Sequence, residues 1–376
     1  MKTPIPIAWI SCVGEKGGAE TLMIECLRAL DRDAFEPHVI QLRPGPLEGM
    51  LRDIGVRVHV LAEHRMRQVG KVAGAIAAIR RLVQSEKLAL LHSNGFRAHV
   101  YGGIGAAVSG IPEVWTTHTV ERAGLSTSAI LAIPTDGVLA NCPRTAEFFK
   151  GRVNAPVELV WPAVNPDVLE RAPSREQLVL TYGLPPSARW VSIGGRLQRY
   201  KGQAEFLQAL AAVRGGNLHG VVIGGSLFGQ ESDYQRELRE LAVALGLRER
   251  VTFTGFIPDA DVAGLFKASY VTLHPAHDED FGLAVAEAQA LGVATIAFAA
   301  VGPAAIVVDG ETGWLVPVGD QGGLNRCLGE ALVNSDETAR RGGNARESCR
   351  RRFGIQEHVR KTMDIYRRAI LGKGRI

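Results

Sequence analysis

The stretch HDEDFGLAVAE, from His277 to Glu287, places four acidic side chains beside the start of a candidate helix. Glu279 and Glu287 are eight residues apart, which is about two helical turns, and Phe281 and Gly282 lie between them. This pattern suits a metal site, a pair of catalytic carboxylates, a site for sugar hydroxyls, or a helix with charged ends and no chemical role. The rest of the chain has to decide among these four.

A helix is predicted from Phe281 to Leu291, because the segment is rich in helix formers and Gly292 supplies a C-terminal stop. The strand-like run ASYVTLHPA precedes it. Glu279 then lies before the helix and Glu287 inside it. The first N–H groups of a helix have no acceptor within it and suit a phosphate or a sugar hydroxyl. Here these donors belong to Phe281, Gly282 and Leu283.

A second charged segment, IGGRLQRYKG, follows the strand-like run WVSIGG. It carries Arg196 and Lys201 on a loop that begins at Gly195. Arginine binds through a planar fork and lysine as a point charge, so two cations five residues apart can converge on a diphosphate. A basic loop that only contacts solvent is the alternative. The position of the loop at a strand end favours binding.

Two glycines, Gly17 and Gly18, open a helix-period segment after the first strand-like run, in VGEKGGAETLMIECLRAL. Glycines at a helix start let backbone N–H groups approach an anion. The spacing matches neither the dinucleotide fingerprint nor the phosphate loop of nucleotide hydrolases. A tight turn without a ligand is the simpler interpretation of this pair alone.

One histidine, His118 in THTVE, directly follows the fifth strand-like run. A single histidine is usually structural. Because ligands bind beyond the carboxyl ends of parallel strands, its position makes a contact with substrate an equally supported interpretation.

Short apolar runs alternate with helix-period segments along the whole chain. Seven strand-like runs end near Val164, a proline-containing region follows, and six more runs begin at about residue 190. This alternation predicts an α/β protein with two doubly wound parallel sheets, joined near residues 165–185. A cleft between two such domains is the expected place for a ligand.

Composition narrows the class of protein. The chain has 376 residues, a net charge of +4, and no aromatic residues interleaved with its basic ones, so we predict no nucleic-acid partner. Five scattered cysteines and the lack of a long apolar segment fit the cytoplasm. A basic segment from Arg65 to Lys87 surrounds an apolar stripe. It fits a helix packed on a sheet with a solvated basic face, or a helix on an anionic membrane.

Taken together, GGAE, GRLQRYKG, EDFGLAVAE and GETGWLVPVGD resemble the retaining glycosyltransferases of family 4, which have the GT-B fold. The resemblance implies two Rossmann-like domains that face each other across a cleft. Residues 1–165 would form the acceptor-binding domain, residues 166–355 the nucleotide-sugar domain, and a C-terminal helix at about 356–376 would cross back to the first.

The resemblance also assigns roles in donor binding. Arg196 and Lys201 would bind the diphosphate and stabilise it as it leaves, with Gly195 at the start of their loop. Glu287 would bind the ribose, and Phe256 and Ile257 would form the wall beside the nucleobase. The glycines Gly17 and Gly18 would approach the donor phosphates from the first domain.

The transferred sugar would be held by Glu279 and by the amides of the helix start, with His118 near the reacting carbon. Two positions depart from the family pattern. Asp280 replaces a glycine and adds a charge near the sugar, which predicts an unusual donor. At the segment VGPAAIV, Ala305 replaces a glutamate, which predicts a rearranged pocket or a weaker activity.

These features predict an enzyme that moves a sugar from a UDP- or GDP-linked donor to a hydroxyl of a glycan or lipid-linked acceptor, in polysaccharide or glycolipid synthesis. The segments Asp31 to Asp33 and Asp278 to Asp280 have the D-x-D spacing of metal-ligand sites. Because Arg196 and Lys201 supply the charge, we predict that no metal or other cofactor is needed. Front-face substitution is preferred to a double displacement on Glu279. A sugar-nucleotide epimerase of the same fold and a non-catalytic sugar-nucleotide binding protein are the alternatives.

Overall fold

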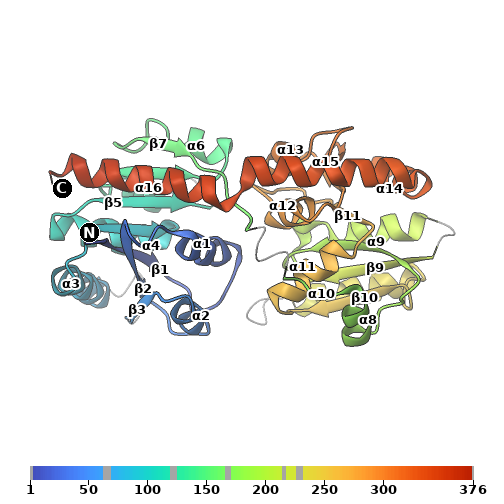
Figure 1. Cartoon of the computed structure of the whole chain (residues 1–376), viewed down its shortest axis with the longest axis horizontal. Coiled ribbons are helices and arrows are strands. Elements are labelled where there is room, and N and C mark those ends of the chain that lie inside the picture. Colours follow the sequence, from blue (N-terminus) through green and yellow to red (C-terminus); the bar gives the residue numbers. More distant parts are fainter. Residues whose placement is uncertain are drawn as a thin grey trace. The chain divides into compact units, whose positions relative to one another are not determined.

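The structure is a computed structural model, and it describes residues 3–61, 69–118, 125–165, 171–213, 217–225 and 232–374. The chain forms two compact units (Figure 1). The N-terminal unit combines Met1–Pro162 with Ile355–Ile376, and the C-terminal unit is Ala163–Gly354.

The N-terminal unit contains a parallel sheet of seven strands in the order β3-β2-β1-β4-β5-β6-β7. Its strands are β1 Ile5–Ser11, β2 Phe35–Gln41, β3 Arg57–Val60, β4 Leu90–Asn94, β5 Glu113–Thr117, β6 Gly137–Ala140 and β7 Val157–Leu159. Its helices are α1 Gly18–Ala29, α2 Leu47–Asp53, α3 Val69–Ser85, α4 Phe96–Ser109, α5 Leu125–Leu131, α6 Pro143–Phe149 and α16 Ile355–Gly372. The central strands are buried along most of their length, because helices cover both faces of a parallel sheet.

The C-terminal unit contains a parallel sheet of six strands in the order β10-β9-β8-β11-β12-β13. Its strands are β8 Arg189–Gly194, β9 Leu218–Ile223, β10 Val251–Gly255, β11 Val271–His274, β12 Thr295–Phe298 and β13 Gly313–Val316. Its helices are α8 Arg175–Tyr182, η1 Arg199–Lys201, α9 Gln203–Ala212, α10 Ser232–Ala244, α11 Asp259–Lys267, α12 Leu283–Ala290, α13 Val301–Ile306, α14 Gln321–Val333 and α15 Ser335–Phe353. The predicted α/β class with two Rossmann-like sheets is therefore confirmed.

Both sheets have a point where the direction of winding reverses. In the N-terminal unit it lies between β1 and β4, and in the C-terminal unit between β8 and β11. Loops after the strands on either side of such a point diverge to opposite faces and leave room for a ligand. The segments that carry the predicted site residues follow β1, β5, β8, β10 and β11.

The C-terminal helix α16 packs within the N-terminal unit against α1 and the strands β4, β5 and β6 (Figure 1, red). A buried polar network fixes it there. The His92 ring contacts the Tyr366 hydroxyl at 2.5 Å and the Thr116 hydroxyl at 2.6 Å, and His358 Nδ1 donates to the Trp161 carbonyl at 2.7 Å. The N-terminal unit is therefore built from two separate parts of the sequence, residues 1–162 and the helix α16.

Acid is expected to destabilise the N-terminal unit through this network. Burial lowers the pKa of His358 from 6.5 to about 4, so the unfolded chain takes up a proton there before the folded one does. Stability is therefore complete above pH 6.5 and falls as the pH drops to about 4, by on the order of 3 kcal/mol for this group. The melting temperature measured between pH 7 and 4.5 should fall steeply in the wild type and less steeply in His358→Gln. Equal slopes for the two proteins would contradict this assignment.

Helix α3 is a sheet-packing helix with a solvated basic face. Its apolar stripe, Val72, Ala75, Ile79 and Val83, is buried in the core beside Ile40 of β2. The cations described on and after it are all exposed, namely Lys71, Arg80, Arg81 and Lys87. Because the stripe is already covered, any membrane contact of α3 would be made by charge alone. Arg65 and Arg67 lie outside the described residues. Among the described helices, none combines the length and the apolar character that crossing a membrane requires.

Candidate active site

Two loops of the C-terminal unit meet at the reversal point between β8 and β11. At Gly202, which ends the first loop, an added Cβ would lie 2.0 Å from the Pro275 carbonyl oxygen of the second loop. The His277 N–H donates to the Tyr200 carbonyl at 2.8 Å. This close approach requires glycine at position 202 and brings the basic segment of one loop against the acidic segment of the other.

A buried ion pair forms where these loops meet. Lys201 Nζ contacts Glu279 Oε2, and the two side chains are only 15% and 13% exposed. His274, the buried last residue of β11, lies 3.4 Å from the same oxygen through Nε2. Burial by itself raises the pKa of Glu279, but the His274 imidazole and the Lys201 ammonium outweigh it and lower this pKa to about 2. Glu279 is therefore a carboxylate at any physiological pH.

Arg196 occupies the same loop but is exposed. Its backbone is fixed, because the Gln203 side chain donates to the Arg196 carbonyl at 2.9 Å. The neighbouring Gly195 has φ +137, a conformation that L side chains rarely adopt. The site thus combines one cation held by a carboxylate with a second one on the surface of the same rigid loop.

Helix α12 begins directly after the acidic segment, with Gly282 as its N-cap. The N–H groups of Leu283 and Ala284 therefore have no acceptor inside the helix. Glu287 is half-buried within it, whereas Phe281 is buried and packs on Phe353. The structure thus places Glu279 before the helix and Glu287 inside it.

The segment before α12 is held by α13. The Gly302 N–H donates to the Glu279 carbonyl at 2.8 Å, and an added Cβ at Gly302 would lie 2.2 Å from the Phe281 carbonyl oxygen. Position 302 therefore accepts only glycine. Ala305 stands where the family pattern has a glutamate, and its backbone carbonyl accepts a hydrogen bond from Arg352.

The wall predicted for the nucleobase follows β10. Phe256 is 58% exposed, and its ring lies against the backbone after β9, where a Cβ added to Gly225 would be 3.0 Å from it. Ile257 is half-buried and packs on the core of this unit. An exposed aromatic ring supported from behind is suited to stacking on a planar ligand.

In the N-terminal unit, His118 follows β5 and is held in one tautomer. Its Nε2 lies 2.7 Å from Asn94 Oδ1, which can only accept, so Nε2 carries the proton and Nδ1 the lone pair. Burial, with a smaller effect of His358, lowers the pKa of His118 to about 4. At neutral pH this side chain is an uncharged acceptor, suited to a sugar hydroxyl.

The glycine pair is at the start of α1 as predicted, with Gly17 as N-cap and Gly18 exposed as the first helical residue. However, the Gly17 N–H already donates to Glu20 Oε2 at 3.1 Å. A phosphate bound by this amide would have to displace that carboxylate. The sequence signal that reveals this is the glutamate three residues after the N-cap.

Comparison with known proteins agrees with these features. A model described as "Glycosyl transferases group 1" matches residues 183–348, and one described as "Glycosyltransferase Family 4" matches residues 16–168. The D-inositol 3-phosphate glycosyltransferase of Saccharomonospora viridis is 30% identical over 305 residues, which cover 75% of this chain and 70% of that protein. The chain belongs to glycosyltransferase family 4. The enzyme of the same name from Xylanimonas cellulosilytica is 27% identical and matches 95% of this chain and 93% of its own length.

Solved structures identify the fold of this family 4 glycosyltransferase as GT-B. Anabaena HepE, solved in complex with UDP and glucose, has a TM-score of 0.84 at 22% identity, covering 96% of this chain and 99% of its own. A sucrose-phosphate synthase from Thermosynechococcus elongatus has a TM-score of 0.79 at 21% identity, with 98% and 100% covered.

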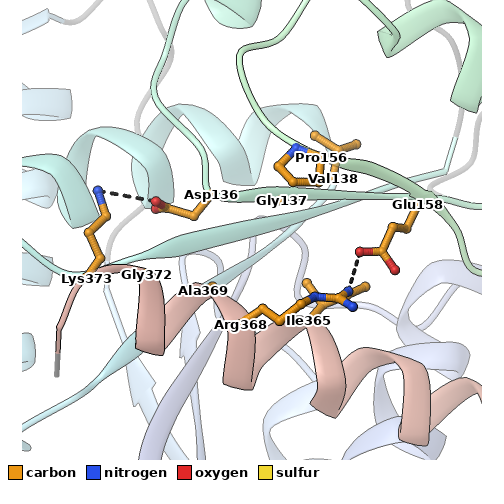
Figure 2. A pocket seen from close by; sticks show the side chains of 10 residues that line it. All are labelled: Asp136, Gly137, Val138, Pro156, Glu158, Ile365, Arg368, Ala369, Gly372 and Lys373. Carbon is orange, nitrogen blue, oxygen red and sulfur yellow. Dashed lines mark hydrogen bonds and ion pairs between the residues drawn. The ribbon is translucent and has the colours of Figure 1, made fainter. Parts of the chain in front are cut away.

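A cavity of about 270 Å³ in the N-terminal unit of this glycosyltransferase lies between β6, β7 and α16, and none of the predicted site residues lines it (Figure 2). Its two cations are already paired, Arg368 with Glu158 and Lys373 with Asp136 at 3.2 Å. Because both charges are neutralised within the cavity wall, it does not offer a site for a diphosphate.

Neither D-x-D segment of the glycosyltransferase, residues 31–33 or residues 278–280, forms a metal cluster within the described part of the chain. Asp31 Oδ1 accepts the N–H groups of Asp33 and Ala34, as a turn requires. Described His, Cys, Asp and Glu side chains bring three ligand atoms within 4.8 Å of one another at one place, which does not include residues 278–280.

Three residues that position the site were not predicted. His274 and Asn94 each end a strand, at β11 and β4, and the strand-end criterion that selected His118 would have found them. Gly302 carries no such signal. Its role depends on how closely α13 approaches the backbone at Phe281, which only the folded chain shows.

Proposed function

We propose that this protein is a retaining, metal-independent glycosyltransferase that moves a sugar from a UDP- or GDP-linked donor to a hydroxyl of a glycan or lipid-linked acceptor. The observation that carries the proposal is the buried contact of Lys201 and His274 with Glu279, beside the exposed Arg196 and the start of α12. The complexes of HepE with UDP and UDP-glucose support a nucleotide-sugar as donor.

Each group has a role in breaking the bond between the sugar and the diphosphate. The leaving diphosphate gains negative charge, and Arg196, Lys201 and the first amides of α12 stabilise that charge. Glu279 accepts a hydrogen bond from a sugar hydroxyl, while Glu287 binds the ribose. His118 Nδ1 accepts a hydrogen bond from a sugar hydroxyl near the reacting carbon. Gly17 and Gly18 approach the donor phosphates once the hydrogen bond from the Gly17 N–H to Glu20 is broken.

Front-face substitution is the favoured mechanism. Both described contacts of Glu279 hold the same oxygen, Oε2, and the low pKa of this carboxylate makes it a weak nucleophile. In the front-face mechanism the departing phosphate itself accepts the proton of the acceptor hydroxyl. No protein nucleophile is then required, and the sugar keeps its anomeric configuration.

The decisive experiment has two stages. A thermal-shift panel of nucleoside diphosphates and their sugars identifies the donor, since a ligand raises stability with the logarithm of its occupancy. Release of the nucleoside diphosphate is then measured with glycan, lipid-linked and phosphorylated-polyol acceptors, the last because relatives are named D-inositol 3-phosphate glycosyltransferases. Acceptor-dependent release supports transfer. Turnover of the donor without any acceptor indicates an epimerase, and binding without either reaction indicates a non-catalytic protein.

Removal of divalent metal ions is expected to leave transfer unchanged, because Arg196 and Lys201 supply the charge that Mg²⁺ supplies elsewhere. Initial rates measured in excess EDTA should agree within about twofold with those measured without it. The loss of a required metal would lower the rate by much more than this margin. Loss of turnover in EDTA with recovery on adding Mg²⁺ or Mn²⁺ would refute metal independence.

A cytoplasmic enzyme at the inner face of a membrane is proposed because the exposed cations of α3 can contact anionic lipids without inserting. The protein is expected to sediment with anionic liposomes at low salt and to remain in the supernatant at high salt. Absence of sedimentation at low salt would count against it.

A further inference from the structure

Two histidines and a glutamate meet in the N-terminal unit, at the edge of its sheet. His38 lies in β2 and His59 in the edge strand β3, on the face that α3 covers, because the register pairs His59 with the core residue Ile40. Glu86 directly follows the last residue of α3, and its N–H donates to the Leu82 carbonyl of that helix. One ligand atom from each of the three side chains lies within 4.8 Å of the other two.

The hydrogen bonds alone do not account for this cluster. His38 Nδ1 lies 3.1 Å from His59 Nε2, yet His38 is 1% exposed and its Nε2 is buried with no hydrogen-bond partner among the described residues. That nitrogen lies 3.6 Å from Glu36 Oε1. With the proton of His38 on Nε2, the lone pair of Nδ1 faces His59 Nε2, which lies 3.1 Å away.

This arrangement matches the chemistry of a metal-binding histidine. A histidine ligand usually donates its second N–H to a carboxylate, and Glu36 Oε1, at 3.6 Å from His38 Nε2, is a carboxylate oxygen just beyond hydrogen-bond distance. With Zn–N bonds of about 2.0–2.1 Å, two ligand atoms of a tetrahedral ion lie about 3.3 Å apart. The observed 3.1 Å between the imidazole nitrogens is close to this value.

We propose that His38, His59 and Glu86 bind a zinc ion that fastens the edge strand β3 to β2 and to the end of α3. Two imidazoles and a carboxylate are a ligand set that Zn²⁺ accepts, with water as the fourth ligand. A cavity of about 230 Å³ is lined in part by Glu36 and Arg57, which neighbour His38 and Glu86.

Arg57 competes with the ion for Glu86. Its guanidinium lies 2.6 Å from Glu86 Oε2 and 3.4 Å from Glu36 Oε1, and its side chain is 56% exposed. Zinc would replace Arg57 at Glu86, while Arg57 keeps its contact with Glu36. The other charged group that acts on His59 is Arg52, which is paired with Glu48. Removal of Arg57 should therefore strengthen metal binding, an effect that a purely structural ion pair does not produce.

Titration of the full chain with ZnCl₂, after treatment with a chelator and its removal, tests the proposal. One equivalent should bind and raise the melting temperature. His59→Gln and Glu86→Gln, both at partly exposed positions, should weaken binding by more than the roughly 10–100-fold that loss of an outer-shell partner costs. Arg57→Gln should strengthen it. Substitution with Co²⁺ should give the visible absorption of a tetrahedral site in the wild type and not in His59→Gln.

His277 provides the matched control, because it is a half-exposed histidine that also contacts a carboxylate, Glu205, at 2.7 Å. His277→Ala should bind zinc like the wild type. The proposal is overturned if the wild type binds no zinc at micromolar concentrations, if His277→Ala alone abolishes binding, or if Arg57→Gln weakens binding. Because these measurements do not use turnover, they are independent of the transfer reaction and of its behaviour in EDTA.

Discussion

Replacing Lys201 by methionine is expected to lower kcat by about 10²- to 10³-fold, the usual effect of removing one group that stabilises developing negative charge. The ammonium has two partners in the proposed reaction, the leaving diphosphate and the Glu279 carboxylate that it contacts in the free enzyme. Methionine keeps an unbranched side chain that is one atom shorter, and it removes the charged terminal group. Steady-state rates with saturating donor and acceptor measure the effect.

A double substitution separates these two roles of Lys201. Lys201→Met leaves a buried carboxylate with His274 as its remaining contact, so it should also cost stability, up to about 3 kcal/mol. Adding Glu279→Gln removes that charge and should restore most of the stability. If Lys201 acts on the leaving group, the double variant stays inactive. Recovery of kcat in the double variant would show that Lys201 only supports Glu279.

Arg199 supplies a control on the same short helix, η1. Its guanidinium is paired with Glu237 on the surface and is 70% exposed. Exposed pairs contribute at most about 1 kcal/mol to stability, so Arg199→Met should keep nearly wild-type kcat and melting temperature. A similar loss of kcat in Arg199→Met would mean that the net charge of the loop matters and that the position of Lys201 does not.

The sequence was sufficient for the fold because buried parallel strands leave a strong local pattern. Each of the thirteen described strands overlaps a predicted run, since each run is apolar, short and bounded by turn residues, and β8 begins one residue before its run. Helix α3 shows the limit of such patterns. Its apolar stripe and basic face fit two environments equally, and only the sheet beneath it decides between them.

The sequence predicted which residues belong to the site, but it did not predict which of them contact one another. Lys201 and Glu279 are 78 residues apart, and the order of β8 and β11 in the sheet brings them together. The contact lowers the pKa of Glu279 and so adds a physical reason for the role expected from the sequence, that of a hydrogen-bond acceptor and not of a nucleophile. The bond from the Gly17 amide to Glu20 was missed although the sequence carries its signal, a glutamate three residues after the N-cap.

Glu279→Gln is expected to lower kcat by about 10- to 100-fold, which corresponds to the roughly 1.5–3 kcal/mol of a hydrogen bond to a charged group. Glutamine keeps the shape and an acceptor oxygen but loses the charge that Lys201 and His274 stabilise. The loss should be the same at every pH from 5 to 8. A carboxylate whose pKa is lowered to about 2 is fully ionised above pH 4.5. The folded protein loses this charge as the pH falls through about 2, and the associated stability is lost progressively between pH 4.5 and about 2.

The size of this loss distinguishes the two mechanisms. If Glu279 were the nucleophile of a double displacement, its amide would be inactive, with a loss on the order of 10⁶-fold as for other enzyme nucleophiles. A glycosyl adduct on Glu279 would then be visible by mass spectrometry of the wild type incubated with donor alone. Glu287→Gln is the matched control in the same segment. It should raise the KM for the donor with little change in kcat, because a ribose contact is equally strong in the ground state and the transition state. A covalent adduct, or a kcat for Glu279→Gln below the detection limit while its fold is intact, would replace front-face substitution by a double displacement.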